Sequence, residues 1–239
     1  ARLIEVKTQA ERDFAIDVRD ILRACDDMTR LIFVCSPNNP TGSTLPREDL
    51  ETLLQERCDR SAIVVDEAYV EFGDKPSVTE LLDRYDNLLV LRTLSKALGF
   101  AGARCGGVAG PTDVIRILGA IQAPYAMATP VVECVEDALQ SAAIDEAQSR
   151  IAEIVAERER LMAAMVAFAC VERVWPSAAN FLLVKVTDSE SLLHEARKSG
   201  ILLRDFGGNL PNCIRVTVGS QAENDRLLTV FAAIERGGS

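Results

Sequence analysis

Runs of consecutive apolar residues alternate with amphipathic stretches in the first half of the chain. Four runs are predicted to be buried strands: LIFVCS (31–36), AIVVDEAY (62–69), NLLVLRT (87–93) and CGGVAG (105–110). A helix is expected from Leu45 to Arg57, with Pro46 in its first turn, where proline is well tolerated. Apolar strands separated by helices predict an α/β domain with a mostly parallel sheet, which binds ligands at the carboxyl ends of its strands.

The second half of the chain follows a different pattern. Residues 129–169 are helical in pattern, with a break expected near 142–145 and one long helix over 150–165. The predicted strands are CVERVWP (170–176), ANFLLVKV (179–186), ILLR (201–204) and CIRVTVG (213–219), with one helix ending at Gly200 and another starting at Gln221. This mixture predicts a smaller α+β domain. We therefore expect a large domain over residues 1–141 and a small C-terminal domain over 142–239, and the opening segment ARLIEV is itself strand-like.

Charge and composition disfavour several classes of protein. The chain carries 26 basic and 36 acidic residues, a net charge of −10, so it repels nucleic acid and anionic membranes, and neither is expected as a partner. The sequence shows no signal peptide and no run of eighteen apolar residues. Seven cysteines without a CxxC pair predict reduced, buried thiols in a cytoplasmic protein. The single histidine, His194, makes a His-rich metal site or a Ser–His–Asp triad a poor hypothesis, and no metal is expected.

The segment RTLSKALGFAGARCG (92–106) has the residues that a phosphorylated cofactor requires. Lys96 follows Thr93 and Ser95 at the end of an apolar strand, and Arg104 comes eight residues later. Hydroxyl groups and a guanidinium can hold a phosphate, and a lysine amine can form a Schiff base with an aldehyde. For this segment alone, a surface lysine in a glycine-rich turn is an equally good interpretation.

A second segment, VVDEAY (64–69), places an acidic side chain at the end of an apolar strand. Burying Asp66 there is unfavourable unless a cation such as a pyridinium nitrogen pairs with it, and Tyr69 could bond the 3′-oxygen of the same ring. The alternative is a Mg²⁺-binding pair formed by Asp66 and Glu67, but the chain contains no GxxxxGK[ST] motif. The segment SPNNPTG (36–42) suits a turn, and an asparagine amide in it could donate to the same oxygen.

Together, SPNNPTG, DEAYVEF and LRTLSKALGFAGARCG resemble the aspartate-aminotransferase-like family of fold-type I pyridoxal-phosphate enzymes, and within it the histidinol-phosphate aminotransferases. The likeness continues in order through APYAMATPV, SAANFLLVK, GILLRD and IRVTVGSQAEN. It implies a cytoplasmic homodimer in histidine biosynthesis that converts histidinol phosphate and 2-oxoglutarate to imidazole acetol phosphate and glutamate. The alternatives are an aromatic or broad-range aminotransferase, a phospho-amino-acid decarboxylase of the same fold, and a non-catalytic module, which would be expected to lack Lys96 or Asp66.

The resemblance implies a role for each residue around the cofactor. Lys96 would form the Schiff base with pyridoxal phosphate and later carry the proton, and Asp66 would pair with the pyridine nitrogen. Asn39 and Tyr69 would bond the 3′-oxygen. The cofactor phosphate would be held by three donors: Thr93, Ser95 and Arg104.

Substrate contacts are implied in the second half of the chain. Arg215, in IRVTVG, matches the arginine that binds the anionic group of the substrate throughout the family. Arg204, in GILLRD, matches a second arginine of the histidinol-phosphate enzymes, where both face the substrate phosphate. Asn180 would lie near the substrate. The alternative for Arg204 and Arg215 is an ordinary pair of strand-end arginines in ion pairs.

The family pattern also includes an N-terminal segment that this sequence lacks. In the family that segment carries a glycine-containing loop at the cofactor phosphate, an aromatic residue that stacks on the cofactor ring, and a tyrosine that reaches the substrate. Because the catalytic motifs are intact and the sequence starts at Ala1, we expect part of a longer product rather than a diverged short protein. The chain alone is then expected to bind the cofactor weakly and to turn over slowly.

Overall fold

Residues 1–237 are described by the computed structural model, and their contacts divide them into two units. The first unit comprises Ala1–Asn38 and Ser43–Gln148, and the second comprises Asn39–Gly42 and the chain from Ser149 onward. The domain boundary at residue 141 stays a prediction.

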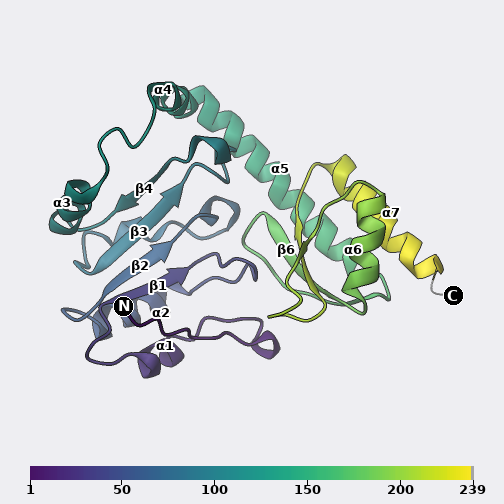
Figure 1. Cartoon of the computed structure of the whole chain (residues 1–239), viewed down its shortest axis with the longest axis horizontal. Coiled ribbons are helices and arrows are strands. Elements are labelled where there is room, and N and C mark those ends of the chain that lie inside the picture. The colour runs from purple at the N-terminus through teal and green to yellow at the C-terminus, as the bar shows by residue number, and fades with distance from the viewer. Residues whose placement is uncertain (238–239) are drawn as a thin grey trace. The chain divides into compact units, whose positions relative to one another are not determined.

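A four-stranded sheet in the order β1-β2-β3-β4 forms the centre of the first unit (Figure 1). Strands β1 (Leu31–Cys35), β2 (Ala62–Asp66) and β3 (Leu88–Thr93) are parallel, and β4 (Gly106–Ala109) pairs with β3 in the antiparallel direction. The mostly parallel sheet is thereby confirmed. Because the three parallel strands run in one direction, the segments that follow them leave the same edge of the sheet.

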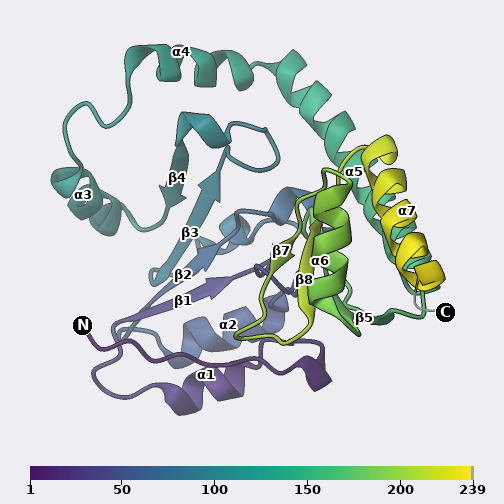
Figure 2. The same cartoon turned by 45° about the vertical axis from the view of Figure 1, so that its right-hand side comes forward.

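Helices α1 (Val18–Ala24) and α2 (Arg47–Glu56) cover one face of this sheet, and both lie on the same side of β1 in Figures 1 and 2. Helix α2 begins directly after its N-cap residue Pro46. Alternate strand residues pack with these helices in one core: Ile32, Val34, Ile63, Val65, Leu88 and Val90. Because strand side chains alternate between faces, Phe33, Asp66 and Thr93 project from the opposite face.

Short helices and three longer ones complete the first unit. The 3-10 helices are η1 (Ala10–Arg12), η2 (Val70–Phe72), η3 (Val78–Leu81) and η4 (Ala101–Ala103). They are joined by α3 (Thr112–Ile121), α4 (Thr129–Ala138) and the start of α5 (Ser141–Met165). The predicted break at residues 142–145 is wrong, because the helix is interrupted at residues 139–140. There the Gln140 N–H bonds to the carbonyl of Asp137, which tightens the last turn of α4.

The second unit contains an antiparallel sheet in the order β5-β6-β8-β7. Its strands are β5 (Val171–Val174), β6 (Phe181–Val186), β7 (Arg204–Asp205) and β8 (Cys213–Thr217). Helices α6 (Ser189–Lys198) and α7 (Gln221–Gly237) share a core with α5 and with alternate residues of β6 and β8 (Figure 2). This arrangement confirms the predicted α+β character of the second half of the chain.

Two predicted strands differ from the structure. The segment ILLR contributes only Arg204 to a strand, because the Ile201 N–H bonds to the carbonyl of Ala196 (2.8 Å) and completes the end of α6 instead. The opening residues 1–6 form no strand, and Leu3 and Ile4 are exposed. An extended segment needs ladder hydrogen bonds to a neighbour to become a strand, and apolar sequence alone does not supply them.

The structure tests two expectations from composition: that the cysteines are buried thiols and that the chain contains no membrane-spanning segment. None of the seven cysteines, all of which the structure describes, forms a disulfide. The prediction that they are buried is wrong for Cys58, in the turn after α2, and for Cys134, on α4, which are both exposed, whereas Cys213 is buried in β8. Burial raises the pKa of the Cys213 thiol. Within residues 1–237, no helix has the length and apolar character needed to cross a bilayer.

We predict that Asp17→Asn weakens folding at neutral pH but not at strongly acidic pH. Hydrogen bonds from the Arg12 guanidinium (2.9 Å) and the Arg19 N–H (2.9 Å) lower the pKa of Asp17 to about 2. An unfolded aspartate has a pKa of about 3.9, so this stabilisation is complete above about pH 4 and is lost as the pH falls through 2. Asparagine still caps a helix, so the substitution isolates the charge.

The measurement is the urea midpoint of both proteins between pH 2 and pH 7. Asp86→Asn, at an exposed turn position, is the matched control. A difference for Asp17→Asn that persists unchanged at pH 2 would contradict the electrostatic origin.

Candidate functional site

Asp66 and Tyr69 lie where β2 ends. Asp66 is the last residue of β2, and its Oδ1 accepts a hydrogen bond from the Ala68 N–H (3.0 Å), which fixes the carboxylate at the strand end. Tyr69 directly precedes η2 and is 5% exposed. The sheet therefore holds an acidic and an aromatic side chain at its carboxyl edge.

Lys96 lies close to Tyr69, in the loop after β3. Its Nζ is 5.4 Å from the centroid of the Tyr69 ring, a cation–π distance, and the side chain is exposed. Thr93, the last residue of β3, accepts a hydrogen bond from the Ser95 N–H (3.1 Å) and donates one to the Ser95 hydroxyl (2.9 Å). The loop that carries the lysine is thus folded back on a pair of hydroxyl groups.

A backbone hydrogen bond brings the segment that contains Arg104 close to the Thr93–Ser95 hydroxyl pair. The Leu94 N–H bonds to the carbonyl of Cys105 (3.2 Å), so the residues on either side of this bond are neighbours in space. Arg104 has a left-handed backbone (φ 53°), and its Nη1 donates to the carbonyl of Ala101 (3.0 Å). The backbone of Arg104 therefore lies near the Thr93–Ser95 turn, and its side chain is exposed.

The chemistry of these donors fits a phosphorylated aldehyde with a basic ring nitrogen. The Lys96 amine suits the aldehyde, two hydroxyls and a guanidinium suit a phosphate, and the Asp66 carboxylate suits a protonated nitrogen. The Lys96 amine also lies over the buried Tyr69 ring, a neighbour that the surface-turn interpretation does not predict. The arrangement therefore supports the cofactor interpretation over the turn interpretation.

Glu67 does not join Asp66 in a divalent-cation pair. It is 2% exposed, and its carboxylate accepts from the Ser77 hydroxyl (2.6 Å) and from the Val78 N–H (2.7 Å). Among the residues that the structure describes, no group of three or more His, Cys, Asp or Glu side chains is placed to hold a metal ion. Glu67 instead ties the end of β2 to the loop before η3.

In the second unit, Arg204 and Arg215 lie directly opposite each other. The two residues are register partners on β7 and β8, and the neighbouring Ile214 and Val216 point into the helical core, so both arginines project from the other face of the sheet. The Arg215 guanidinium carbon is 5.1 Å from the centroid of the Phe181 ring. Arg204 is exposed. Like charges in this relation repel each other, so the pair concentrates positive charge on the sheet surface.

Asn39 belongs to the second unit and contacts Arg215. The Arg215 Nη1 donates to the Oδ1 of Asn39 (2.8 Å), which leaves the amide NH₂ of Asn39 as its donor. Three residues later, Gly42 is buried with a left-handed backbone (φ 75°). A side-chain carbon at Gly42 would lie 2.2 Å from the Ser177 hydroxyl, so the SPNNPTG turn can approach this segment only because it ends in glycine.

A buried asparagine that the sequence reasoning missed holds the turn after β8. Asn224 is 2% exposed, accepts from the Gly219 N–H (3.0 Å) and donates to the Gly219 carbonyl (3.0 Å) and to Glu157 (2.9 Å). Hydrogen bonds from Arg160 and then from Asn224 lower the pKa of Glu157. The sequence signal is the motif SQAE, in which Ser220 and Glu223 cap α7 and so place the next residue at the turn.

Arg158 supports the neighbouring loop and was missed as well. Its side chain is 9% exposed, and its Nη1 donates to the carbonyl of Ala179 (3.0 Å). The next residue, Asn180, accepts from the Val218 N–H through its carbonyl (2.9 Å). Glu157 and Arg158, adjacent residues of α5, thus hold two loops. Arg158 binds the loop before β6, and Glu157 binds Asn224, which holds the turn after β8.

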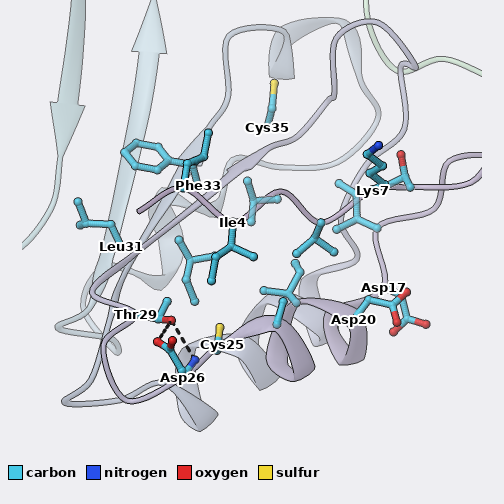
Figure 3. Close-up of a pocket in the computed structure, with 18 of the residues that line it drawn as sticks. Ile4, Lys7, Asp17, Asp20, Cys25, Asp26, Thr29, Leu31, Phe33 and Cys35 are labelled. Atoms are coloured by element: carbon cyan, nitrogen blue, oxygen red, sulfur yellow. Dashed lines mark hydrogen bonds between the residues drawn. The ribbon is translucent and has the colours of Figure 1, made fainter. Parts of the chain in front are cut away.

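A cavity of about 740 Å³ lies elsewhere in the first unit, between residues 1–30 and β1. Figure 3 shows Ile4, Leu31 and Phe33 lining it, with Asp17 and Asp20 near its far end. None of the residues predicted for chemistry lines this cavity. Its walls are the opening segment, α1 with the loop that follows it, and β1.

Known proteins resemble this chain along nearly its full length. The sequence model of the family described as aminotransferase class I and II matches residues 1–231. Histidinol-phosphate aminotransferase of Xylella fastidiosa strain 9a5c is 44% identical over 225 residues, which are 93% of this chain and 62% of that protein. The protein of the same name from Yersinia enterocolitica is 38% identical over 234 residues, which are 97% of this chain and 62% of that protein. The chain thus spans 62% of the length of these two curated relatives.

Solved structures show the same fold. Histidinol-phosphate aminotransferase from Sinorhizobium meliloti, solved in complex with pyridoxal-5′-phosphate, has a TM-score of 0.84 and 26% identity, covering 100% of this chain and 65% of that one. Histidinol-phosphate aminotransferase from Clostridium acetobutylicum has a TM-score of 0.83 at 24% identity, covering 94% of this chain and 69% of that one. The predicted fold class is confirmed.

We predict that Gly42→Ala destabilises the chain more than Gly99→Ala. Both glycines have φ 75°, but a side-chain carbon at Gly99 would meet nothing within 4 Å, whereas at Gly42 it would collide with Ser177. A left-handed backbone costs alanine about 1–2 kcal/mol at either position, and the collision adds to this only at Gly42. Urea unfolding of the two variants measures the difference, and equal losses would contradict close packing of the SPNNPTG turn.

Proposed function

The chain belongs to the class I and II aminotransferase family, and we propose that the protein uses pyridoxal phosphate to transfer an amino group. The observation that carries this proposal is the position of the Lys96 amine, 5.4 Å from the Tyr69 ring at the sheet edge where Asp66 ends β2. An amine, an aromatic hydroxyl and a carboxylate at one edge match the reactive needs of that cofactor.

Pyridoxal phosphate supplies an aldehyde that condenses with amines and a ring that withdraws electrons from the attached carbon. Lys96 binds that aldehyde through Nζ and afterwards accepts and returns a proton. The carboxylate of Asp66 holds a proton on the ring nitrogen, and the Tyr69 hydroxyl orients the neighbouring ring oxygen. The phosphate is bound by three side chains: Thr93, Ser95 and Arg104.

For the second unit we propose recognition of substrate anions. Arg204 and Arg215 are register partners on one face of the sheet, an arrangement that an anion bound by both side chains would stabilise. The Asn39 carbonyl holds one arm of Arg215, and we assign its NH₂ to the cofactor oxygen. Asn180 is proposed as a further substrate contact. Two guanidinium groups suit a phosphate, which favours histidinol phosphate as the amino donor and 2-oxoglutarate as the acceptor.

The relatives support this substrate, because two that share 38–44% identity with the chain are named for it. We propose that the products are imidazole acetol phosphate and glutamate, in histidine biosynthesis. The same proposal includes a cytoplasmic location and a homodimer, as the family resemblance implies.

We predict that Lys96→Ala abolishes covalent capture of the cofactor. Pyridoxal phosphate is added, the protein is reduced with borohydride, and peptide mass spectrometry locates the adduct. The unaltered protein is expected to carry the adduct on Lys96, and Lys75→Ala, at a surface lysine 77% exposed, is expected to retain it. An adduct of undiminished yield in Lys96→Ala would contradict the assignment.

We predict that Arg204→Met and Arg215→Met each raise KM for histidinol phosphate by roughly 10- to 100-fold, because each removes charge-assisted hydrogen bonds to the phosphate. Arg173→Met is the control, since that arginine also lies over an aromatic ring, Trp175 at 5.3 Å, on the same sheet. Phenylalanine and phosphothreonine are compared as donors. A stronger effect of Arg204→Met on phenylalanine than on the phosphorylated donors would contradict the phosphate role.

A further inference from the structure

A cluster of three charged residues lies behind the edge that carries Lys96. Val65 and Val90 are register partners in β2 and β3, and the Glu67 N–H continues the ladder to the carbonyl of Leu91 (3.0 Å). Strand alternation therefore directs Glu67 and Arg92 to the same face as Val65 and Val90, which is the face covered by α1 and α2. Their chain neighbours Asp66 and Thr93 project from the opposite face.

Arg92 bridges two carboxylates on that reverse face. Its Nη2 donates to the Oε1 of Glu71 (2.7 Å), and its Nη1 is 3.6 Å from the Oε2 of Glu67. Glu67 is almost fully buried, and the side chains of Glu71 and Arg92 are 25% and 38% exposed. Two acidic groups this close together need the cation between them, so the three side chains form one unit.

Each member of the cluster adjoins a residue proposed for chemistry. Glu67 follows Asp66, Glu71 comes two residues after Tyr69, and Arg92 directly precedes Thr93 in the loop that leads to Lys96. The backbone that carries Asp66 and Tyr69 is therefore tied to the backbone that carries Thr93 and Lys96 through side chains that are not among those proposed to bind cofactor or substrate.

We propose that Arg92 is a positioning residue: by joining Glu67 and Glu71 behind the sheet, it fixes the place of Asp66 and Tyr69 relative to Thr93 and Lys96. This inference rests on the function proposed above for those four residues. Its physical basis is that the fork of a guanidinium can bind two carboxylates at once, which a single ammonium group does in a much less defined geometry.

The test compares Arg92→Met with Arg47→Met. Arg47 also bridges two carboxylates, Glu51 (3.3 Å) and Glu80 (2.9 Å), and its side chain is 40% exposed, but it lies at the start of α2. The two substitutions remove the same chemical group from similar exposure. Because Glu67 is 2% exposed whereas Glu51 and Glu80 are 22% and 57% exposed, the comparison is made at the amides beside Asp66 and Thr93 and not on overall stability.

Two quantities are measured besides activity. The first is hydrogen exchange of the Ala68 and Ser95 amides, which bond to Asp66 (3.0 Å) and to Thr93 (3.1 Å). The second is the dissociation constant of pyridoxal phosphate. For Arg92→Met we expect both amides to exchange roughly 10-fold faster and the constant to rise roughly 10-fold. For Arg47→Met both are expected to stay within about two-fold of the unaltered protein.

Equal effects of the two substitutions on the amides, or none from Arg92→Met, overturn the proposal. If Arg92→Met does not fold, Arg92→Lys and Glu71→Gln replace it. We expect these variants to raise the amide exchange rates and the dissociation constant by a smaller factor than Arg92→Met. No change in either quantity would overturn the proposal. Borohydride capture in the unaltered protein keeps the two hypotheses apart. Absence of an adduct on Lys96 contradicts the proposed function, whereas the exchange of Ala68 and Ser95 is measured without cofactor.

Discussion

Parallel hydrogen bonding between β2 and β3 decides how Asp66 and Thr93, two residues proposed for chemistry, are placed relative to each other. Asp66 pairs with Leu91, and the ladder continues one bond further to Glu67. Because side chains alternate along a strand, this register sends Asp66 and Thr93 to one face and their neighbours Glu67 and Arg92 to the other. A slip of one residue would exchange the two faces of that strand and separate the lysine loop from its carboxylate.

Strand pairing in the second unit brings two like charges together, whereas in the first unit it brings opposite charges together. In the first unit, Arg92 lies between two carboxylates, so the cluster carries no excess positive charge. In the second, Arg204 and Arg215 are register partners and the group that contacts Arg215 is the neutral amide of Asn39. A chain with a net charge of −10 thus keeps a local concentration of positive charge on one sheet surface. The first arrangement fixes a backbone, and the second suits an anion.

How far the fold could be predicted depends on whether the signal is local. The end of β3 at Thr93 followed from the sequence, and the apolar run of β2 gives way to Asp66, although the strand predicted over 62–69 ends three residues earlier, at Asp66. The short strand at Arg204 and the absence of a strand over residues 1–6 did not follow, because ladder bonds depend on what lies alongside. Apolar composition does not determine that neighbour.

Some residues of the candidate site could be found from local motifs in the sequence, and others could not. Lys96, Asp66 and Tyr69 were found from segments whose residue types match one chemistry, and the structure places the Lys96 amine beside the Tyr69 ring and Asp66 at the end of β2. Arg92 and Glu67 lie 25 positions apart in the sequence, and only the register of β2 against β3 makes them neighbours. If the register were known, the alternation of side chains along each strand would predict that Arg92 and Glu67 lie on the same face of the sheet. Sequence alone contains no signal for that register at the level of single residues.

Each unit contains buried polar atoms that lack a hydrogen-bond partner. Within residues 1–237 they include the Oε2 of Glu71, the Nε of Arg92 and the Nε of Arg215. An unpaired buried donor or acceptor is unfavourable, so folded chains rarely keep one without a reason. Here all three belong to the two clusters that adjoin the residues proposed for chemistry. A fold selected only for stability would replace such atoms by apolar groups, since burial of a charged network seldom improves stability. Their position beside Tyr69, Thr93 and Asn39 fits side chains that fix geometry at those residues rather than side chains that add stability.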